Sequence, residues 1–362
     1  MNLERLCDGP LLAQADLFTS PSKTPWGGRR IVERYKRHLG IDSDGIVGES
    51  WELSGQPDWP SLVQSPLYPD AVSILEIAQA APTALFGNKL SQFPFLMKLL
   101  NSGSWLPYRQ QLGQFGTNAH ELHTQLSTQH QHSDQHRAMM ARNLSVQVHP
   151  RPGLATAKSE AWVILEAEEG AGCYLGLRDG ITQLAFERAM RRGEDLSQLL
   201  QFVPMQAGDV FWIPSGTLHA VGAGILMLEP QQSSQVTFRA YDWGRARPLH
   251  FEEVLSSVDW DGPGAMRCQP RLASAAPTQP EIIQWVQEPE LTLQAIRFDS
   301  PDQQFKTQPD RLLGYFVGSG CVTIECSTRT LKVPYGRSFF LPAAIGPCLL
   351  RATDGPATLW QC

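Results

Sequence analysis

No stretch of the 362-residue sequence approaches the ~20 consecutive apolar residues that cross a membrane as a helix. The opening MNLERLCDGP also lacks the apolar core of a secretory signal. Positive charge is not in excess, since the net charge at pH 7 is −6, which gives no support for nucleic-acid binding. The seven cysteines are odd in number and scattered, so reduced thiols are expected. These absences predict a cytoplasmic protein that binds neither membranes nor nucleic acid.

The most informative run is GDVFWIPSGTLHA, a glycine turn, a short apolar strand and a Pro-x-Gly turn followed by His219. This order is typical of a metal-binding jelly-roll barrel. About sixty residues upstream, the runs NLSVQVHP and KSEAW contain Gln147, His149 and Glu160. Because residues i and i+2 of a strand point to the same face, Ser145, Gln147 and His149 should all face one barrel interior.

Two neutral imidazoles, a carboxylate and an amide oxygen form a mixed nitrogen and oxygen set that suits zinc or another borderline divalent ion. No cysteine lies nearby, which favours an open catalytic site over a closed structural one. Each residue taken alone has a plainer interpretation, because a single Gln or Glu on a strand is usually solvated and a single His is usually hydrogen-bonded. The four together favour a metal site.

Two later strands carry further polar side chains. Glu229 ends the run GILMLEP, where it is predicted to lie at the barrel mouth. In the next strand, Gln235, Thr237 and Arg239 share a face. An inward arginine is costly unless it meets an anion, and a phosphorylated or enediolate ligand would supply one. The alternative is a surface arginine with Phe238 facing inward.

The remaining chain divides into short patterned segments. The first sixty residues are predicted to form strands packed on the barrel, with Trp26 and Trp51 as anchors, and the apolar spacing over 70–87 predicts a helix followed by a second helical turn. The segment 101–142 contains five of the nine histidines and is predicted to form helices. It is interpreted as a solvated insertion, with a second metal site or a lid over the barrel as alternatives.

Downstream of the metal strands, FERAMRRGEDLSQLL predicts an amphipathic helix that buries Leu196–Leu200. Residues 248–280 are rich in loop formers and are interpreted as a linker. From LTLQAIRF onward, the chain is predicted to form a series of strands between Gly and Pro turns, which repeats the jelly-roll pattern without any histidine. This second barrel cannot carry an equivalent metal site.

With PWGG, GESWELS, FPFLMKLL, LSVQVHP, KSEAW and PSGTLHA in this order, the chain resembles the type I mannose-6-phosphate isomerases of the cupin superfamily. The resemblance covers nearly the whole chain except 101–142. It implies a mainly β fold of two jelly-roll (cupin) barrels with helical insertions. We expect a metal-binding domain over 1–265, which includes the insertion, and a metal-free domain over 266–362.

The resemblance also implies a reaction. Zinc, one ion per chain, would be held by Gln147, His149, Glu160 and His219. The chain would interconvert mannose 6-phosphate and fructose 6-phosphate through a cis-enediol, whose negative charge the metal and a nearby cation stabilise. The partner is thus a small sugar phosphate, and the expected state is a monomer or a weak homo-oligomer.

Motif position also assigns individual roles. Arg239 matches a catalytic arginine of the family, and Glu229 and Lys158 match residues proposed for acid–base work or ring opening. Ser145 and Arg245 match residues on the phosphate side. The sequence departs from the family at Gln235 and Phe238, where Asp and Tyr are usual, at Arg151 and in the insertion. These departures leave open a related isomerase with a shifted substrate or a non-catalytic sugar-phosphate sensor.

Overall fold

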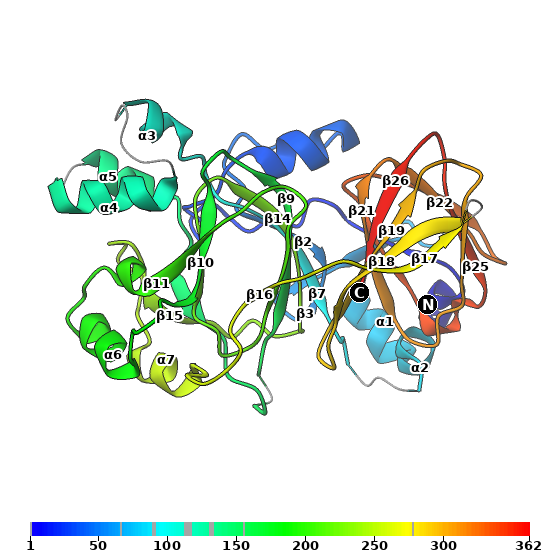
Figure 1. Ribbon diagram of the computed structural model, residues 1–362. Coiled ribbons are helices and arrows are strands. Elements are labelled where there is room, and N and C mark those ends of the chain that lie inside the picture. Colours follow the sequence, from blue (N-terminus) through cyan, green and yellow to red (C-terminus); the bar gives the residue numbers. More distant parts are fainter. Residues whose placement is uncertain are drawn as a thin grey trace.

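The computed structural model describes residues 2–65, 67–88, 92–111, 118–129, 134–154, 156–276 and 279–362. Two β-barrels lie side by side, and helices cover the outer end of the first barrel (Figure 1). The predicted mainly β architecture with two jelly-roll barrels and helical insertions is confirmed.

The first barrel consists of two antiparallel sheets that face each other. The larger sheet has the order β16-β12-β9-β14-β7-β2, formed by β2 (Glu49–Leu53), β7 (Leu96–Asn101), β9 (Glu160–Ala167), β12 (Val210–Ile213), β14 (Ile225–Gln231) and β16 (Met266–Arg267). The facing sheet has the order β11-β10-β13-β8-β15, formed by β8 (Val146–Val148), β10 (Gly172–Leu177), β11 (Leu200–Pro204), β13 (His219–Val221) and β15 (Phe238–Tyr241). Side chains of β8, β13 and β15 can therefore meet those of β7, β9 and β14 inside the barrel.

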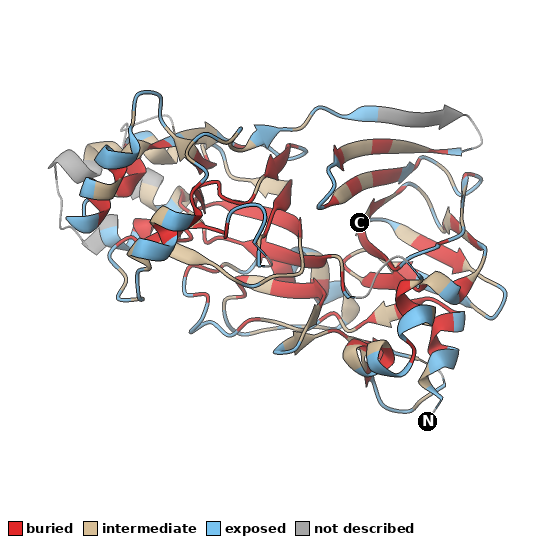
Figure 2. Ribbon diagram, turned by 90° about the horizontal axis from the view of Figure 1, so that it is seen from below, coloured by how far each residue is buried: buried red, intermediate tan, exposed pale blue. Residues whose placement is uncertain are grey.

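The alternation of side chains on β14 assigns its two faces to two different cores. Ile225 and Met227 belong to the core of the first barrel, whereas Leu226 and Leu228 belong to the core between the barrels. All seven residues of the strand are buried. Full burial of one such side chain contributes roughly 1.5–3 kcal/mol, so both faces stabilise the strand's position. Figure 2 shows this buried material concentrated in the strands.

The second barrel pairs a nine-stranded sheet with a four-stranded one. The nine-stranded sheet has the order β17-β18-β19-β26-β21-β24-β1-β5-β6, formed by β1 (Leu11–Ala13), β5 (Leu62–Gln64), β6 (Val72–Ser73), β17 (Arg271–Ala276), β18 (Gln279–Gln287), β19 (Thr292–Phe298), β21 (Leu313–Ser319), β24 (Ser338–Leu341) and β26 (Ala357–Gln361). The smaller sheet has the order β20-β25-β22-β23, formed by β20 (Gln304–Thr307), β22 (Cys321–Glu325), β23 (Thr330–Pro334) and β25 (Cys348–Ala352).

N-terminal strands thus complete the C-terminal sheet. Leu11 and Leu12 of β1 pair with Phe340 and Phe339 of β24. A buried ion pair also joins the N-terminal and C-terminal segments. Lys36 Nζ lies 2.6 Å from Glu52 Oε1 and donates to the carbonyl of Gly336. Strands from both sides of the expected boundary at residue 265 therefore share one sheet, and β16 on its C-terminal side pairs with β12 of the first barrel.

The helices are short. They are η1 (Leu3–Asp8), η2 (Ile31–Lys36), η3 (Arg37–Leu39), α1 (Ile74–Ala80), α2 (Pro82–Phe86), α3 (Leu106–Gln111), α4 (Ala119–Gln129), α5 (Asp134–Met140), α6 (Gln183–Arg191), η4 (Leu196–Leu199), α7 (Phe251–Ser257) and η5 (Ala343–Ile345). The two helical turns predicted over 70–87 are α1 and α2, and a capping box on Ser73 begins α1. No helix among the described residues is both long and apolar enough to cross a membrane.

Three local expectations are corrected. The first sixty residues contain η1–η3 as well as strands, although Trp26 and Trp51 are buried as predicted. The helix expected to run through Leu196–Leu200 ends before Gly193, whose φ of +67° is left-handed, and η4 follows separately. The expected linker over 248–280 contains α7, β16 and β17, and Val254 and Val258 of this segment are buried against the barrel.

Candidate metal centre

The four side chains predicted to bind metal converge inside the first barrel. Gln147 lies on β8, His149 follows that strand, and His219 begins β13 directly opposite Gln147. Glu160 begins β9 in the facing sheet. His149 Nε2 lies 3.0 Å from Glu160 Oε1, and His219 Nε2 lies 3.9 Å from Glu160 Oε2 and 3.1 Å from the Gln147 amide nitrogen. The two histidines and Glu160 thus offer ligand atoms that all lie within 4.8 Å of one another.

These spacings fit a small tetrahedral ion. Metal–ligand bonds of about 2.0–2.1 Å place tetrahedral ligand atoms about 3.3 Å apart, and the two His–Glu separations of 3.0 and 3.9 Å lie on either side of that value. The buried His149 Nε2 also has no hydrogen-bond partner, as expected of an atom that holds a ligand. Turning the Gln147 amide, whose O and N are interchangeable in assignment, would present its oxygen to the same point.

Backbone carbonyls fix the ring orientation of both histidines. His149 Nδ1 lies 3.0 Å from the carbonyl of Val236, and His219 Nδ1 lies 2.9 Å from that of Thr217. A carbonyl only accepts, so each Nδ1 carries the proton and each Nε2 keeps a lone pair for a metal.

Burial and charge set the protonation states that a metal requires. Burial, with Lys158 adding to it, lowers the pKa of His149 to about 3, and burial also lowers the pKa of His219. Burial alone would raise the pKa of Glu160, but the charge of Lys158, whose Nζ lies 2.7 Å from Oε1, and the contact with His149 hold it well below its usual value. Neutral imidazoles and an ionised carboxylate are the forms that bind zinc.

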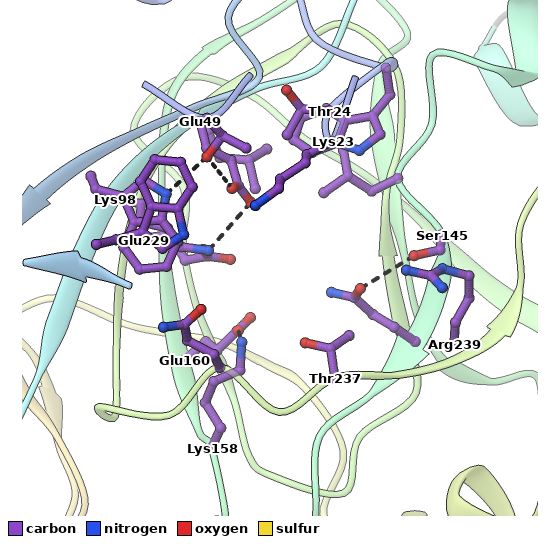
Figure 3. A pocket seen from close by; sticks show the side chains of 18 of the residues that line it. Lys23, Thr24, Glu49, Lys98, Ser145, Lys158, Glu160, Glu229, Thr237 and Arg239 are labelled. Carbon is purple, nitrogen blue, oxygen red and sulfur yellow. Dashed lines mark hydrogen bonds and ion pairs between the residues drawn. The ribbon is translucent and has the colours of Figure 1, made fainter. Parts of the chain in front are cut away.

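Above these residues the barrel encloses a cavity of about 380 Å³. Gln147 and Glu160 line it together with the predicted catalytic residues Lys158, Glu229 and Arg239. Figure 3 shows Glu49, Lys98 and Glu229 on one side of the cavity and Ser145 and Arg239 on the other. The structure therefore brings most of the predicted site into one polar chamber.

Glu229 is the carboxyl group most suited to proton transfer. Burial, with the charge of Glu160 adding to it, raises the pKa of Glu229 to about 7, although Lys98 opposes the shift. Glu229 Oε2 lies 2.9 Å from Lys98 Nζ, which also lies 3.5 Å from Glu49. A carboxyl group with a pKa near the working pH can both accept and return a proton.

The alternation predicted for the strand at Arg239 is observed. Gln235, Thr237 and Arg239 all line the cavity, while the ring of Phe238 packs against that of His250. Arg239 Nη1 donates to the carbonyl of Pro248 at 2.8 Å, and its buried Nε has no hydrogen-bond partner. The alternative of a surface arginine with Phe238 facing inward is wrong.

The two residues predicted to bind phosphate are placed differently. Ser145 lines the cavity, and its Oγ lies 3.4 Å from Gln147 Oε1. Arg245 is not among the lining residues, because its nitrogens bond Asp242 at 2.8 and 3.1 Å and the carbonyls of Ala141 and Asn143 at 2.9 and 2.8 Å. Its place at the cavity is taken by Arg247, which the sequence did not single out.

Among its described residues, the histidine-rich insertion contributes no ligand to this centre. His130 and His132 lie outside the described residues, and the side chain of His136 is likewise not described. On α4, His120 stacks on Phe202 and the buried His123 bonds Asp195 at 2.6 Å and Ser197 at 2.9 Å. The described part of the insertion is thus packed on the barrel through one face of α4 rather than fully solvated.

Sequence reasoning missed Lys98, Glu49, Lys23, Trp59 and Arg247 as lining residues. Lys98 had a signal, since a lysine stands alone in the otherwise apolar run FPFLMKLL. The others lie on short or irregular segments, where the two-residue alternation predicts no direction.

Comparison with known proteins gives relatives of one kind. No protein-family model matches the chain. The sequence is 28% identical over 350 residues to mannose-6-phosphate isomerase of Streptococcus mutans, covering 93% of each chain. It is 36% identical over 130 residues to mannose-6-phosphate isomerase ManA of Bacillus subtilis, covering 32% of this chain and 41% of that protein.

Solved structures agree in fold. The crystal structure of mannose 6-phosphate isomerase from Bacillus subtilis superposes with a TM-score of 0.71 at 21% identity and covers 97% of this chain and 98% of its own. A zinc-bound mannose 6-phosphate isomerase superposes with a TM-score of 0.63 at 14% identity and the same coverage. The chain is thus similar in sequence to a mannose-6-phosphate isomerase over nearly its whole length and has the fold of the solved mannose 6-phosphate isomerases.

Proposed function

We propose that this protein is a zinc-dependent aldose–ketose isomerase that interconverts mannose 6-phosphate and fructose 6-phosphate through a cis-enediol. The observation that carries the proposal is that Gln147 and Glu160 of the metal-ligand group line one cavity with Lys158, Glu229 and Arg239, while His149 and His219 complete the group around Glu160. The names of its relatives support the same reaction. A binding module would need neither an open metal site nor a carboxyl group held near pKa 7.

Gln147, His149, Glu160 and His219 would hold the zinc. When bound, zinc polarises the oxygens of the sugar and stabilises the negative charge of the enediol. The four residues come from opposite sheets, so the floor of the cavity is fixed by the barrel itself.

The chain's own groups complete the chemistry. Glu229 Oε2 accepts and returns the proton, and Lys98 at 2.9 Å holds that carboxylate in place. Lys158, whose Nζ lies 2.7 Å from Glu160, is placed beside the metal ligands, where it donates hydrogen bonds to the sugar oxygens. Arg239, whose Nε makes no hydrogen bond and lies 3.9 Å from Asp242, faces the enediolate from the opposite wall.

We assign the phosphate to the wall formed by Ser145, Arg239 and Arg247 in place of Arg245. Arg247 lines the cavity with 28% of its side chain exposed, and Asp242 orients it through Nε at 2.8 Å and Nη2 at 2.6 Å. Charge-assisted hydrogen bonds of this kind contribute about 1.5–3 kcal/mol each.

Arg247→Ala should therefore raise the KM for mannose 6-phosphate by roughly 10–100-fold with a smaller effect on kcat. Arg245→Ala should instead lower the Tm, because it removes the hydrogen bonds to Ala141 and Asn143. Steady-state kinetics and thermal melts separate the two, with the exposed Arg192→Ala as control. A larger KM effect at Arg245 than at Arg247 would reverse the assignment.

The reaction itself is tested by a coupled assay of fructose 6-phosphate formation from mannose 6-phosphate. We expect turnover to vanish on treatment with a chelator and to return with zinc, because the lone pairs of His149 and His219 have no other partner of comparable strength. Zinc-loaded protein that binds the sugar phosphate without converting it would instead be a sugar-phosphate sensor.

We further propose that the protein works in the cytoplasm as a monomer or weak homo-oligomer. All seven cysteines are free, as expected of a reducing compartment. Size-exclusion chromatography with light scattering tests the oligomeric state.

A further inference from the structure

Two glutamines form a bridge beside the cavity, which Gln235 lines and Gln56 does not. Gln235 Nε2 donates to Gln56 Oε1 at 3.1 Å, and Gln56 Nε2 donates to Ser233 Oγ at 2.8 Å. Gln56 ends β3 (Gly55–Gln56), which forms a separate hairpin with β4 (Trp59–Pro60). Gln235 and Ser233 belong to the connection between β14 and β15. The pair therefore joins segments that lie 179 residues apart in the sequence.

The hairpin side of this bridge carries an aromatic wall. Trp59 lines the cavity and stacks on Trp51, with ring centroids 5.7 Å apart and planes inclined by 14°. Lys23 Nζ lies 5.1 Å from the Trp59 ring, and Lys98 Nζ lies 5.5 Å from the Trp51 ring. Cation–π and stacking contacts thus connect the hairpin to Lys98. Lys98 is the partner of the proposed proton-transfer group Glu229.

The other side of the bridge carries the anion-facing wall. Gln235, Thr237 and Arg239 follow one another on the same face of the strand segment. A hydrogen bond at Gln235 therefore fixes the beginning of the segment that presents Arg239, and the same bond fixes the hairpin that presents Trp59.

The bond is suited to opening and closing. Both amides are neutral and the contact is exposed to solvent, so its net contribution is about 0.5–1.5 kcal/mol, or roughly tenfold in an equilibrium at most. A bond of this strength holds one arrangement and still opens frequently. A buried ion pair such as Lys36–Glu52 would instead lock the hairpin.

We propose that the Gln56–Gln235 pair is a latch that closes the Trp59 hairpin over a bound monosaccharide phosphate. This inference rests on the proposed isomerase function and adds two positioning residues to it. The latch acts on the binding of the sugar and leaves the reacting groups unchanged.

The test is a double-mutant cycle with Gln56→Leu, Gln235→Leu and the double variant, all loaded with zinc, and mannose 6-phosphate as substrate. Each single variant should raise KM about three- to tenfold and leave kcat within about twofold, because the bond holds the closed form only. The double variant should be no worse than Gln56→Leu alone, because that change already removes the bond to Gln235 together with the bond from Gln56 to Ser233. Gln287→Leu, at the exposed end of β18, serves as control.

Unchanged KM in both single variants, or effects that multiply in the double variant, would overturn the latch. Failure of the proposed function is recognised separately, because wild-type protein would then show no turnover. In that event the same cycle is run by calorimetric titration of the zinc-loaded proteins with mannose 6-phosphate. The dissociation constant then replaces KM as the quantity compared, and the same outcomes support or reject the latch.

Discussion

Replacing Glu229 by glutamine should lower kcat by roughly 10²–10⁴-fold, the range contributed by a positioned general acid–base group. Glutamine keeps the shape of the side chain, so zinc content should be unchanged. The pH profile is a second measurement. The pKa of Glu229 is about 7 without metal, and nearby zinc would move it lower, so wild-type activity should fall as the pH drops through or below this value.

This fall in activity at low pH should be absent from the residual activity of the Gln variant. Glu166→Gln is the matched control, because Glu166 lies on the same β9 strand as Glu160 but pairs with Arg34 outside the cavity. Full kcat in Glu229→Gln would remove Glu229 from proton transfer and leave Lys158 as the remaining candidate.

Glu160→Ala should abolish zinc retention and turnover together. Changes that only reorient a metal ligand weaken metal binding about 10–100-fold. Loss of a ligand should therefore weaken zinc binding by more than roughly 100-fold. The buried Lys158 also loses its partner at 2.7 Å, and the measured Tm will show how far the fold suffers. Zinc content by elemental analysis and the coupled assay are the readouts.

His38→Ala is the control for this metal measurement, because His38 stacks on Tyr335 in the second barrel and should not affect zinc. A Glu160→Ala protein that keeps both zinc and turnover would contradict the metal assignment, whatever its stability.

The strands around the site could be predicted because their side chains alternate regularly. Gln147 and His149 flank the buried Val148, and Glu229 lies on the same face of β14 as Ile225 and Met227. In a regular strand, residue spacing determines which side chains share a face, so the residues inside the first barrel could be predicted from the sequence.

Arg245 shows where that reasoning fails. Trp243, with a φ of +54°, and Gly244, with a φ of +77°, break the strand just before it. Residues 245–250 form no strand, so alternation gives no direction there, and Arg247 rather than Arg245 reaches the cavity. No local pattern in YDWGRAR distinguishes the two arginines, because their directions depend on Asp242, which binds both.

The pairing of N-terminal strands with the second barrel was also beyond local patterns. Strand β1 is only three residues long, and nothing in its residues indicates that Leu11 pairs with Phe340 of β24. Strands β5 and β6 join the same sheet through β1. Helix α7 was missed for a different reason. Its apolar residues Phe251, Val254, Leu255 and Val258 have helical spacing, but loop-forming neighbours on both sides obscured it.

During synthesis, β1 leaves the ribosome long before its partner β24 has been made. Ala13 ends β1 and Ser338 begins β24, so 338 − 13 = 325 residues are made before the partner strand emerges. At about 5–20 residues per second, the first strand waits roughly 15–65 s with an open edge. Open edges invite pairing with other chains, so the nascent protein depends on β1 staying shielded until β24 has been made.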